Sequence, residues 1–411
     1  MSYRFIHYIQ DSNTLHDTLE HSPISSPQLL THHSPQSPQS MIEVRAAGVA
    51  GLGVFAKTLI PRGTRIFSER SLLTLHRNKP SSFYPLLQRL SAHDRDVFMS
   101  LSAFRTRETD VMRWAIAGVH TLHNAFMSAF GLFGKNKHAV SNSNSVSNSN
   151  SDLNSNSNSC PKRYSLSDHV SAISIFRSNS FNIGQSPISM PVSQGSDASN
   201  PSISHALFPQ TARINHSCLP NAQGNYNPAT QKFNVHATRD IERGEEVKLN
   251  YLMEEGGLRR SRMERLREGY GFDCKCPACD FGQVRGRRGE ERRLKMVEKL
   301  KGFVVAMEGR GLLKEEMDKE VEVERELEAT MAYIELFESE GIAGRELSNM
   351  YMKAAELNLD MCKHQEALRL AEQALQLDED CLGTDHLDYK KNLEIVQGLK
   401  KELDENILQH P

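Results

Sequence analysis

Three cysteines lie close together in the sequence, in the pattern Cys274-x-Cys276-x-x-Cys279. Thiolates at this spacing are typical ligands of a structural zinc ion, which takes four ligands in a closed tetrahedral site. The segment supplies three of them, so a fourth must come from elsewhere in the fold. Cys218 is the candidate, because it lies in a polar, turn-like segment of the same region. The alternative is that the three cysteines are surface thiols or a redox pair.

A second group of polar residues surrounds Cys218, in the segment Asn215–Asn221 (NHSCLPN). Taken alone, a histidine between asparagine and serine is more often a structural residue than a ligand or a base. Three other segments make a functional role the more favoured interpretation of His216. They are 50–56 (AGLGVFA), 244–251 (GEEVKLNY) and 270–279 (YGFDCKCPAC).

The elements that must position these residues are of two kinds. Short runs of β-branched and aromatic residues, broken by glycine and proline, begin at Met41, and strands and turns return from Phe208. Apolar residues recur at helical spacing over 81–133 and from about Gly289 to the end. The fold class is therefore α+β, with a helical C-terminal part. The C-terminal part has helix pairs with small residues at the expected crossing points, a pattern typical of a tetratricopeptide stack. Only about one and a half repeat units are present.

Two segments have the composition of disordered chain. Residues 1–40 are rich in Ser, Pro, Gln and His, and 16 of the 19 positions in 141–159 are Ser or Asn. Such sequences bury too little apolar area to offset chain entropy. The remainder of the 411 residues is enough for two folded parts.

The net charge of −2 hides an uneven distribution along the chain. Residues 256–301 carry 14 Lys+Arg and 7 Asp+Glu, whereas residues 302–411 carry 12 and 26. The overall balance argues against a uniformly basic nucleic-acid-binding protein. Seven cysteines are too few for a disulfide scaffold, and no apolar run has the length of a membrane span or a secretory signal. We therefore expect a nuclear and/or cytoplasmic protein without a membrane partner.

The remaining cysteines and the arginine-rich segment have simpler interpretations. Cys160 is predicted to be a free thiol in the disordered loop, and Cys362 and Cys381 are predicted to pack in the core of helices. The segment 285–293 (RGRRGEERR) is predicted to be a solvated linker and helix start, because glutamates and glycines interrupt it and no aromatic residues interleave. Nucleic acid is the less favoured partner for it.

The four segments, in this order and spacing, resemble the SET-domain protein-lysine methyltransferases over roughly residues 42–280. The arrangement is most similar to the SET-and-MYND subfamily, in which helices are inserted between the halves of the catalytic fold, and 178–183 (SNSFNI) is a further match. The MYND zinc finger itself is expected to be absent, because residues 75–205 contain a single cysteine, Cys160.

The resemblance implies a particular domain organisation. After the tail of residues 1–40, a β-rich SET domain would span 41–280. It would include a helical insert (about 75–135), a disordered Ser/Asn-rich loop (about 136–170) and a post-SET zinc segment (270–280). A helical, tetratricopeptide-like domain would follow over 281–411.

The resemblance also implies an activity, the transfer of a methyl group from S-adenosylmethionine to a lysine ε-amine of a protein, with histones and other basic proteins as candidate substrates. Tyr251 and Tyr270 would be catalytic. A structural Zn²⁺ ion would be bound by Cys218, Cys274, Cys276 and Cys279. Residues that would bind the cofactor are Gly51, Leu52, Gly53, Asn179, Asn215, His216, Tyr251 and Phe272. The alternative is a non-catalytic, zinc-containing adaptor that binds protein partners or chromatin through its helical lobe.

The acidic C-terminal part suggests how a substrate could be attracted. If its helices fold beside the catalytic part, their charge would line the substrate cleft and favour basic, lysine-containing segments. The alternative is that most of these acidic side chains lie on solvated faces.

Overall fold

The computed structural model describes residues 41–76, 83–104, 166–183, 204–252, 257–313 and 319–409. They separate into two compact units, one from the described residues of Met1–Phe83 and Asn179–Pro411 and the other from those of Tyr84–Ser178. The predicted N-terminal tail, the Ser/Asn-rich segment 141–159 and Cys160 lie outside the described residues, as does most of the predicted helical insert.

The first unit begins with a β-hairpin. Strand β1 (Ile42–Ala46) pairs antiparallel with β2 (Leu52–Ala56), and the short 3-10 helix η1 (Gly48–Ala50) lies between them. Gly51 closes the turn with a φ of 81°, a left-handed conformation that glycine tolerates best. The glycine-rich segment of the sequence is therefore the end of a hairpin.

Two three-stranded antiparallel sheets follow, and the first has the order β3-β9-β8. Its strands are β3 (Arg65–Arg70), β9 (Lys232–Ala237) and β8 (Ala222–Asn227). The other sheet has the order β4-β6-β5, from β4 (Leu73–His76), β6 (Ser204–Leu207) and β5 (Ser180–Asn182). Their apolar faces share one core, in which the ring of Phe233 lies 4.8 Å from that of Phe181 and 4.9 Å from that of Phe208.

A short parallel pair links two of the segments singled out in the sequence. Strand β7 (Asn215–His216), which follows the 3-10 helix η3 (Thr211–Arg213), pairs with β10 (Lys248–Leu249). Ser217 N also donates to Leu249 O at 2.9 Å. The pairing brings His216 and Tyr251 together although 35 residues separate them.

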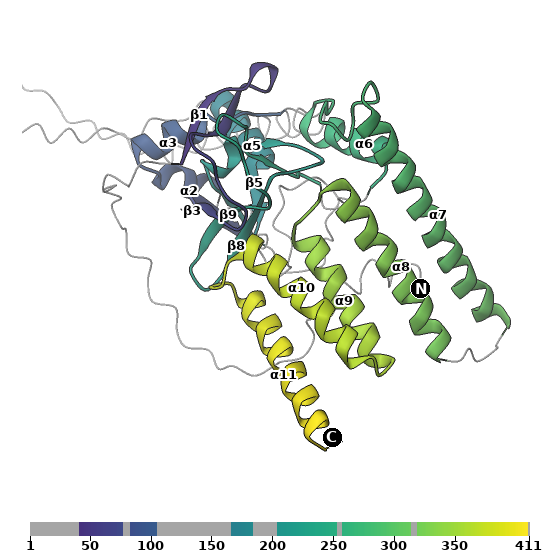
Figure 1. Cartoon of the computed structure of the whole chain (residues 1–411). Helices are drawn as coiled ribbons and strands as arrows, with labels where there is room; N and C mark the ends of the chain where they lie inside the picture. Colours follow the sequence, from purple (N-terminus) through teal and green to yellow (C-terminus); the bar gives the residue numbers. More distant parts are fainter. Residues whose placement is uncertain are drawn as a thin grey trace, which may run out of the picture. The chain divides into compact units, whose positions relative to one another are not determined.

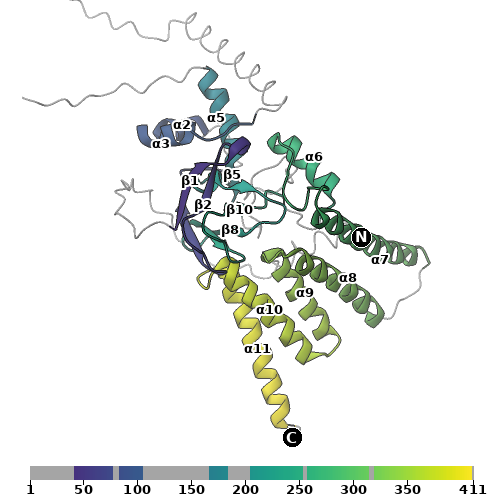
Figure 2. The same cartoon turned by 45° about the horizontal axis from the view of Figure 1, so that its top comes forward.

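The C-terminal part is helical, as predicted. Successive helices pack against one another from α7 onward, and Figures 1 and 2 show this series from green to yellow. Buried alanines, including Ala354, Ala371 and Ala374, lie in its core and allow close helix contacts. The resemblance to a tetratricopeptide stack stays a prediction. The helices are α6 (Arg259–Tyr270), α7 (Val284–Leu313), α8 (Lys319–Glu340), α9 (Arg345–Asp360), α10 (His364–Leu382) and α11 (Leu387–Gln409).

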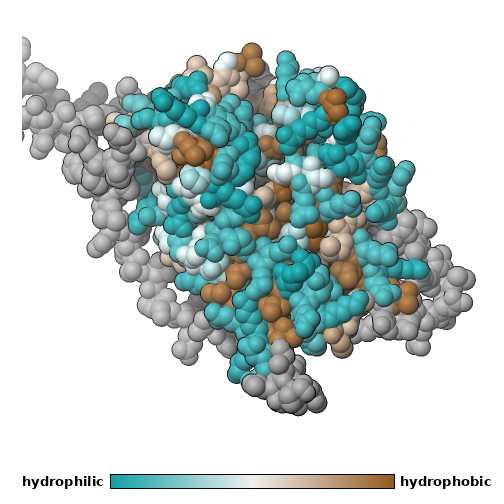
Figure 3. All heavy atoms as spheres, in the orientation of Figure 1, coloured by the Kyte–Doolittle hydropathy of each residue, from teal (hydrophilic) through white to brown (hydrophobic). Residues whose placement is uncertain are grey.

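Helix α10 packs against strands β8 and β9, and polar contacts join the helices to the β-rich part. Arg62 Nε donates to Asp380 Oδ2 at 2.5 Å, and Asn225 Nδ2 donates to Cys381 O at 2.9 Å. Arg65 is paired with Asp385 in the turn before α11. Hydrophilic residues cover most of the face drawn in Figure 3.

The second unit contains α3 (Ala92–Met99), most of α2 (Phe83–Arg89) and α5 (Leu166–Asn179). Ser91 caps α3, because its side chain accepts a hydrogen bond from Asp94 N at 3.0 Å. Phe104 N donates to Ser178 Oγ at 3.0 Å, which fixes the chain after α3 to the end of α5.

Two predictions about single segments are wrong in part. Cys362 is exposed and has a φ of 57°, because α9 ends before it, whereas Cys381 is fully buried as predicted. The arginine-rich segment is a helix start, as predicted, and Arg285, Arg287 and Arg288 are exposed, but it is not a linker, and Arg293 is fully buried against Glu340. Within the described residues, no helix has both the length and the apolar character needed to span a membrane.

Candidate active site and metal centre

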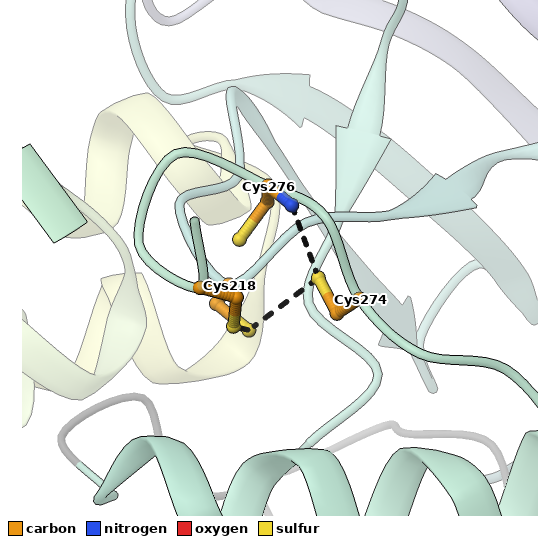
Figure 4. Close-up of side chains that lie close together, drawn as sticks. Cys218, Cys274 and Cys276 are labelled. Carbon is orange, nitrogen blue, oxygen red and sulfur yellow. Dashed lines mark hydrogen bonds between the residues drawn. The ribbon is translucent and has the colours of Figure 1, made fainter. Parts of the chain in front are cut away.

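The four predicted metal ligands come together in the structure. The sulfur atoms of Cys218, Cys274, Cys276 and Cys279 all lie within 4.8 Å of one another. Cys218 follows β7, whereas the other three follow α6, which ends at Gly271 in the left-handed conformation. Figure 4 shows the side chains of Cys218, Cys274 and Cys276 directed into the same small space.

The spacing of these sulfur atoms fits a zinc ion. A tetrahedral site with Zn–S bonds of about 2.3 Å separates its sulfur atoms by about 3.8 Å. Cys218 Sγ lies 3.6 Å from Cys279 Sγ and 4.0 Å from Cys274 Sγ. Hydrogen bonds among the sulfur atoms raise the pKa of Cys218 and lower the pKa of Cys276. The four groups thus share protons, which a divalent cation would replace.

His216 lies between the cysteine cluster and Tyr251. Its Nδ1 accepts a hydrogen bond from Tyr251 N at 3.0 Å, and its Nε2 lies 3.3 Å from Cys218 Sγ. Because Nδ1 is an acceptor, the proton of the neutral ring is assigned to Nε2, which then donates to the sulfur. Burial lowers the pKa of His216 to about 3 and keeps the ring neutral. One imidazole therefore ties the metal centre to the Tyr251 backbone.

Four rings, which we call the ring cluster, lie together beside the cysteines: His216, Tyr251, Tyr270 and Phe272. The centroid of Tyr251 is 5.2 Å from that of His216 and 4.9 Å from that of Tyr270, and Phe272 is 6.0 Å from His216. Tyr251 and Tyr270 come from different segments, one after β10 and the other at the end of α6. The structure thus brings together both predicted catalytic residues, Tyr251 and Tyr270, and three predicted cofactor-binding residues, His216, Tyr251 and Phe272.

The hydroxyl group of Tyr251 has a fixed direction, because it donates to Ile214 O at 2.5 Å. Burial raises the pKa of Tyr251 above its ordinary value, and the nearby charge of Glu246 adds to the shift. Burial also raises the pKa of Tyr270. Both phenols therefore remain protonated near neutral pH, and their oxygen atoms are polar groups in an aromatic setting.

Asn215 joins the glycine turn to this site. Its Nδ2 donates to Leu52 O at 3.0 Å and to Glu246 Oε1 at 2.7 Å. A Cβ atom at Gly53 would lie 2.5 Å from Glu246 Oε1 and 3.0 Å from Asn215 Nδ2, so a larger residue there would displace these two side chains. At Gly51 a Cβ would meet no atom within 4 Å, and the positive φ is the constraint.

Asn179 is a predicted cofactor-binding residue outside both the ring cluster and the glycine turn. It is the last residue of α5, directly before β5, and is buried. Within the matched segment 178–183, the strand comprises Ser180–Asn182.

The side chain of Glu246 contributes to the site although no sequence motif predicted a role for it. Its carboxylate accepts from Asn215 and forms an ion pair with Lys248 at 2.7 Å. The alternation of the segment carries the signal, because Val247 and Leu249 are buried whereas Glu246 and Lys248, which alternate with them, face the other side.

The comparisons with known proteins agree with this geometry. Residues 51–252 match the family model described as the SET domain. Histone-lysine N-methyltransferase set5 of Schizosaccharomyces pombe is 34% identical over 26% of this chain and 31% of its own length. Protein-lysine N-trimethyltransferase SMYD5 of Mus musculus is 40% identical over 18% of each chain. The chain thus matches less than a third of the length of either relative.

Among solved structures, the SET domain of LSMT bound to lysine and AdoHcy is 12% identical and has a TM-score of 0.33, over 90% of this chain and 89% of that one. This score is too low to compare the two folds. The family match and the two sequence relatives agree: residues 51–252 of this chain are a SET domain.

Proposed function

We propose that this protein transfers a methyl group from S-adenosylmethionine to the ε-amine of a lysine in a protein substrate. The observation that carries the proposal is the convergence of Tyr251, Tyr270 and Phe272 with His216, beside the turn held by Asn215. The SET-domain match and the names of the relatives support the same class of reaction.

The residues fit the chemistry of this cofactor. When bound, S-adenosylmethionine supplies an electrophilic methyl group on a positively charged sulfur. Aromatic faces attract such a cation, and an aromatic ring can stack on an adenine. The residues that would hold the cofactor are Gly51, Leu52, Gly53, Asn179, Asn215, His216, Tyr251 and Phe272.

The chain has to position the amine and keep it neutral. A lysine held against the Tyr251 and Tyr270 rings would lose water, and desolvation lowers the pKa of an ammonium group. The Tyr251 proton is donated to Ile214 O, so the phenol oxygen is available to accept a hydrogen bond from the amine. Because both phenols stay protonated, the amine proton would leave to solvent. Positioning therefore accounts for most of the proposed rate enhancement.

We propose that zinc at the four cysteines holds the segment of Tyr270 and Phe272 against β7. Cys276→Ser is expected to lose zinc and to weaken cofactor binding, because the ring cluster depends on that segment. Zinc content by mass spectrometry and cofactor affinity by calorimetry would measure both effects. Cys362→Ser is the matched control, because Cys362 is exposed and outside the cluster. Unchanged cofactor affinity in a zinc-free Cys276→Ser protein would contradict this role of the metal.

The deciding experiment is transfer of a labelled methyl group from S-adenosylmethionine into proteins of a cell lysate and into purified histones. Wild-type protein is expected to label at least one lysine-containing protein, and Tyr251→Phe much less. If wild-type protein binds no S-adenosylmethionine and labels nothing, the methyltransferase proposal fails. In that case the chain would have to act through binding alone.

A further inference from the structure

One buried arginine of α6 directly contacts the cysteine cluster. Arg262 is only 1% exposed, although α6 is strongly polar. Its Nη2 lies 3.8 Å from Cys279 Sγ and 3.4 Å from Ala278 O, and its Nη1 donates to Gly257 O. Burying a guanidinium costs free energy unless charge and hydrogen bonds offset that cost, so the environment of Arg262 must be anionic.

The proposed metal centre supplies that negative charge. Four thiolates around a divalent zinc ion carry a net charge of about −2. A guanidinium remains protonated throughout the ordinary pH range and has no acceptor atoms, so it suits thiolate sulfur as a permanent donor. We propose that Arg262 is the counter-cation of the four-cysteine cluster and connects it to helices α7 and α8. The inference rests on zinc occupancy of the cluster.

Glu290 of α7 provides the connection. Its Oε2 lies 4.0 Å from Arg262 Nη1, and its two oxygens accept from the backbone N–H of Arg259 at 2.9 and 3.0 Å. Arg259 Nε in turn donates to Cys279 O at 2.8 Å. One carboxylate of α7 therefore holds the N-terminal end of α6 directly. It holds the metal-ligand segment through Arg259 and Arg262, which both contact Cys279.

The network continues from α7 into α8. Arg293, three residues after Glu290, lies on the same face of α7 and is fully buried. Its Nη1 donates at 3.0 Å to Glu340 Oε2, which belongs to a fully buried side chain at the end of α8. Arg292 also pairs with Glu340, and Arg285 Nη2 donates to Glu340 O at 2.9 Å.

Arg262 has the weakest carboxylate contact in this group. Glu290 lies 4.0 Å from Arg262, whereas Glu340 contacts Arg293 at 3.0 Å and also pairs with Arg292, whose side chain is 36% exposed. A zinc–thiolate cluster beside Arg262 would supply the close negative charge that Glu290 does not. This gives the arginine-rich segment a structural purpose, and it predicts that α7 and α8 help to retain the metal.

The test is the rate at which the purified full-length protein releases zinc to a chromogenic chelator. Arg262→Met is expected to release zinc about 10- to 100-fold faster than wild type, the usual effect of losing a group that supports a ligand. Arg262→Lys, which keeps the charge, should restore part of the retention. Glu290→Gln should also release zinc faster. Arg260→Met is the matched control, because the Arg260 side chain is 89% exposed on the same helix and should not change the rate.

A second readout is the absorption spectrum of the cobalt-substituted protein, because loss of a donor to Cys279 should shift the sulfur-to-cobalt bands in Arg262→Met and not in Arg260→Met. Folded Arg262→Met protein with the wild-type release rate and spectrum would overturn the proposal. If Arg262→Met does not fold, unchanged zinc release in Glu290→Gln would overturn it equally. Wild-type protein that binds no zinc would instead refute the metal centre itself.

Discussion

The hydroxyl group of Tyr251 and the imidazole of His216 are each held by two constraints. Tyr251 donates to Ile214 O through its side chain and to His216 Nδ1 through its backbone N–H. His216 then reaches Cys218 with its other nitrogen. At the scale of single residues, the site is therefore preorganised by short hydrogen bonds in which each nitrogen or hydroxyl has one defined partner.

Removal of the Tyr251 hydroxyl tests this arrangement most directly. Tyr251→Phe is expected to lower kcat roughly 100-fold, because a positioned polar group at the reacting atoms is lost. Cofactor affinity should change little, since the ring remains. Single-turnover methyl transfer and calorimetry would separate the two quantities. Tyr389→Phe, in α11 far along the chain, is a control for loss of a phenol. A wild-type kcat in Tyr251→Phe would remove this residue from the mechanism.

At the scale of elements, the contact of α7 with α8 depends on a glycine. A Cβ atom at Gly289 would lie 2.7 Å from Glu340 Oε2 and 2.9 Å from Arg293 Nη1. Glycine within a helix ordinarily costs up to about 1 kcal/mol relative to alanine. Here the absence of a side chain leaves room for the buried ion pair of Arg293 and Glu340 beside the helix backbone.

Gly289→Ala is therefore expected to lower the free energy of unfolding by about 1–3 kcal/mol, the usual effect of overpacking. Gly398→Ala in α11 is the matched control, because a Cβ there meets no atom within 4 Å. It should raise the free energy of unfolding by up to about 1 kcal/mol. Urea denaturation would measure both changes, and equal effects of the two substitutions would contradict the packing argument.

Local patterns in the sequence were sufficient to predict the elements near the site. The fold class and the helical C-terminal part followed from period-2 and helical spacing, and the cysteine set followed from ligand chemistry. The burial of Arg293 was not predictable, because its partner Glu340 lies 47 residues away in the sequence. A run of charged residues ordinarily indicates a solvent-exposed segment. The exposure of Cys362 was missed because α9 ends two residues earlier than the apolar spacing suggests, at Asp360.

At the scale of the whole molecule, the acidic helices are both internal partners and exposed charge. Asp380 and Asp385 pair with arginines of the β-rich part. Other acidic side chains are exposed on the helices α8 and α10, among them Glu324, Glu328, Glu335, Glu372 and Glu379. If this charge steers a basic substrate, KM should rise several-fold between about 20 and about 200 mM salt.

The measurement is KM for a basic lysine peptide over that salt range, with a neutral lysine peptide as control. A KM for the basic peptide that is indifferent to salt would exclude steering by the acidic helices. The alternative stated from the sequence, that these side chains are only solvated, would then apply.

The junction between β9 and the C-terminal helices is expected to be sensitive to acid. Burial, with the nearby charge of Arg65, lowers the pKa of His236 to about 4 in spite of Asp385, and burial also lowers that of His386 beside it. His236 is therefore neutral in the folded protein and binds a proton more readily when unfolded. Its contribution to stability is complete above pH 6.5 and is lost as the pH falls toward 4.

The free energy of unfolding should accordingly fall by about 1–2 kcal/mol between pH 7 and pH 5 through His236. Denaturation of wild type and His236→Gln at both values would measure this contribution, because the variant lacks the titrating group. An identical pH dependence in the two proteins would show that other groups are responsible.

The pairs that join the β-rich part to the helices also have a consequence for synthesis. Arg62 leaves the ribosome 318 residues before Asp380, and Arg65 leaves it 320 residues before Asp385. A growing chain therefore exposes these arginines, and the parts of β8 and β9 that α10 covers, until α10 has been synthesised. This protein is expected to depend on chaperones that cover those strands during translation, and a stall before α10 should leave a nascent chain prone to aggregation.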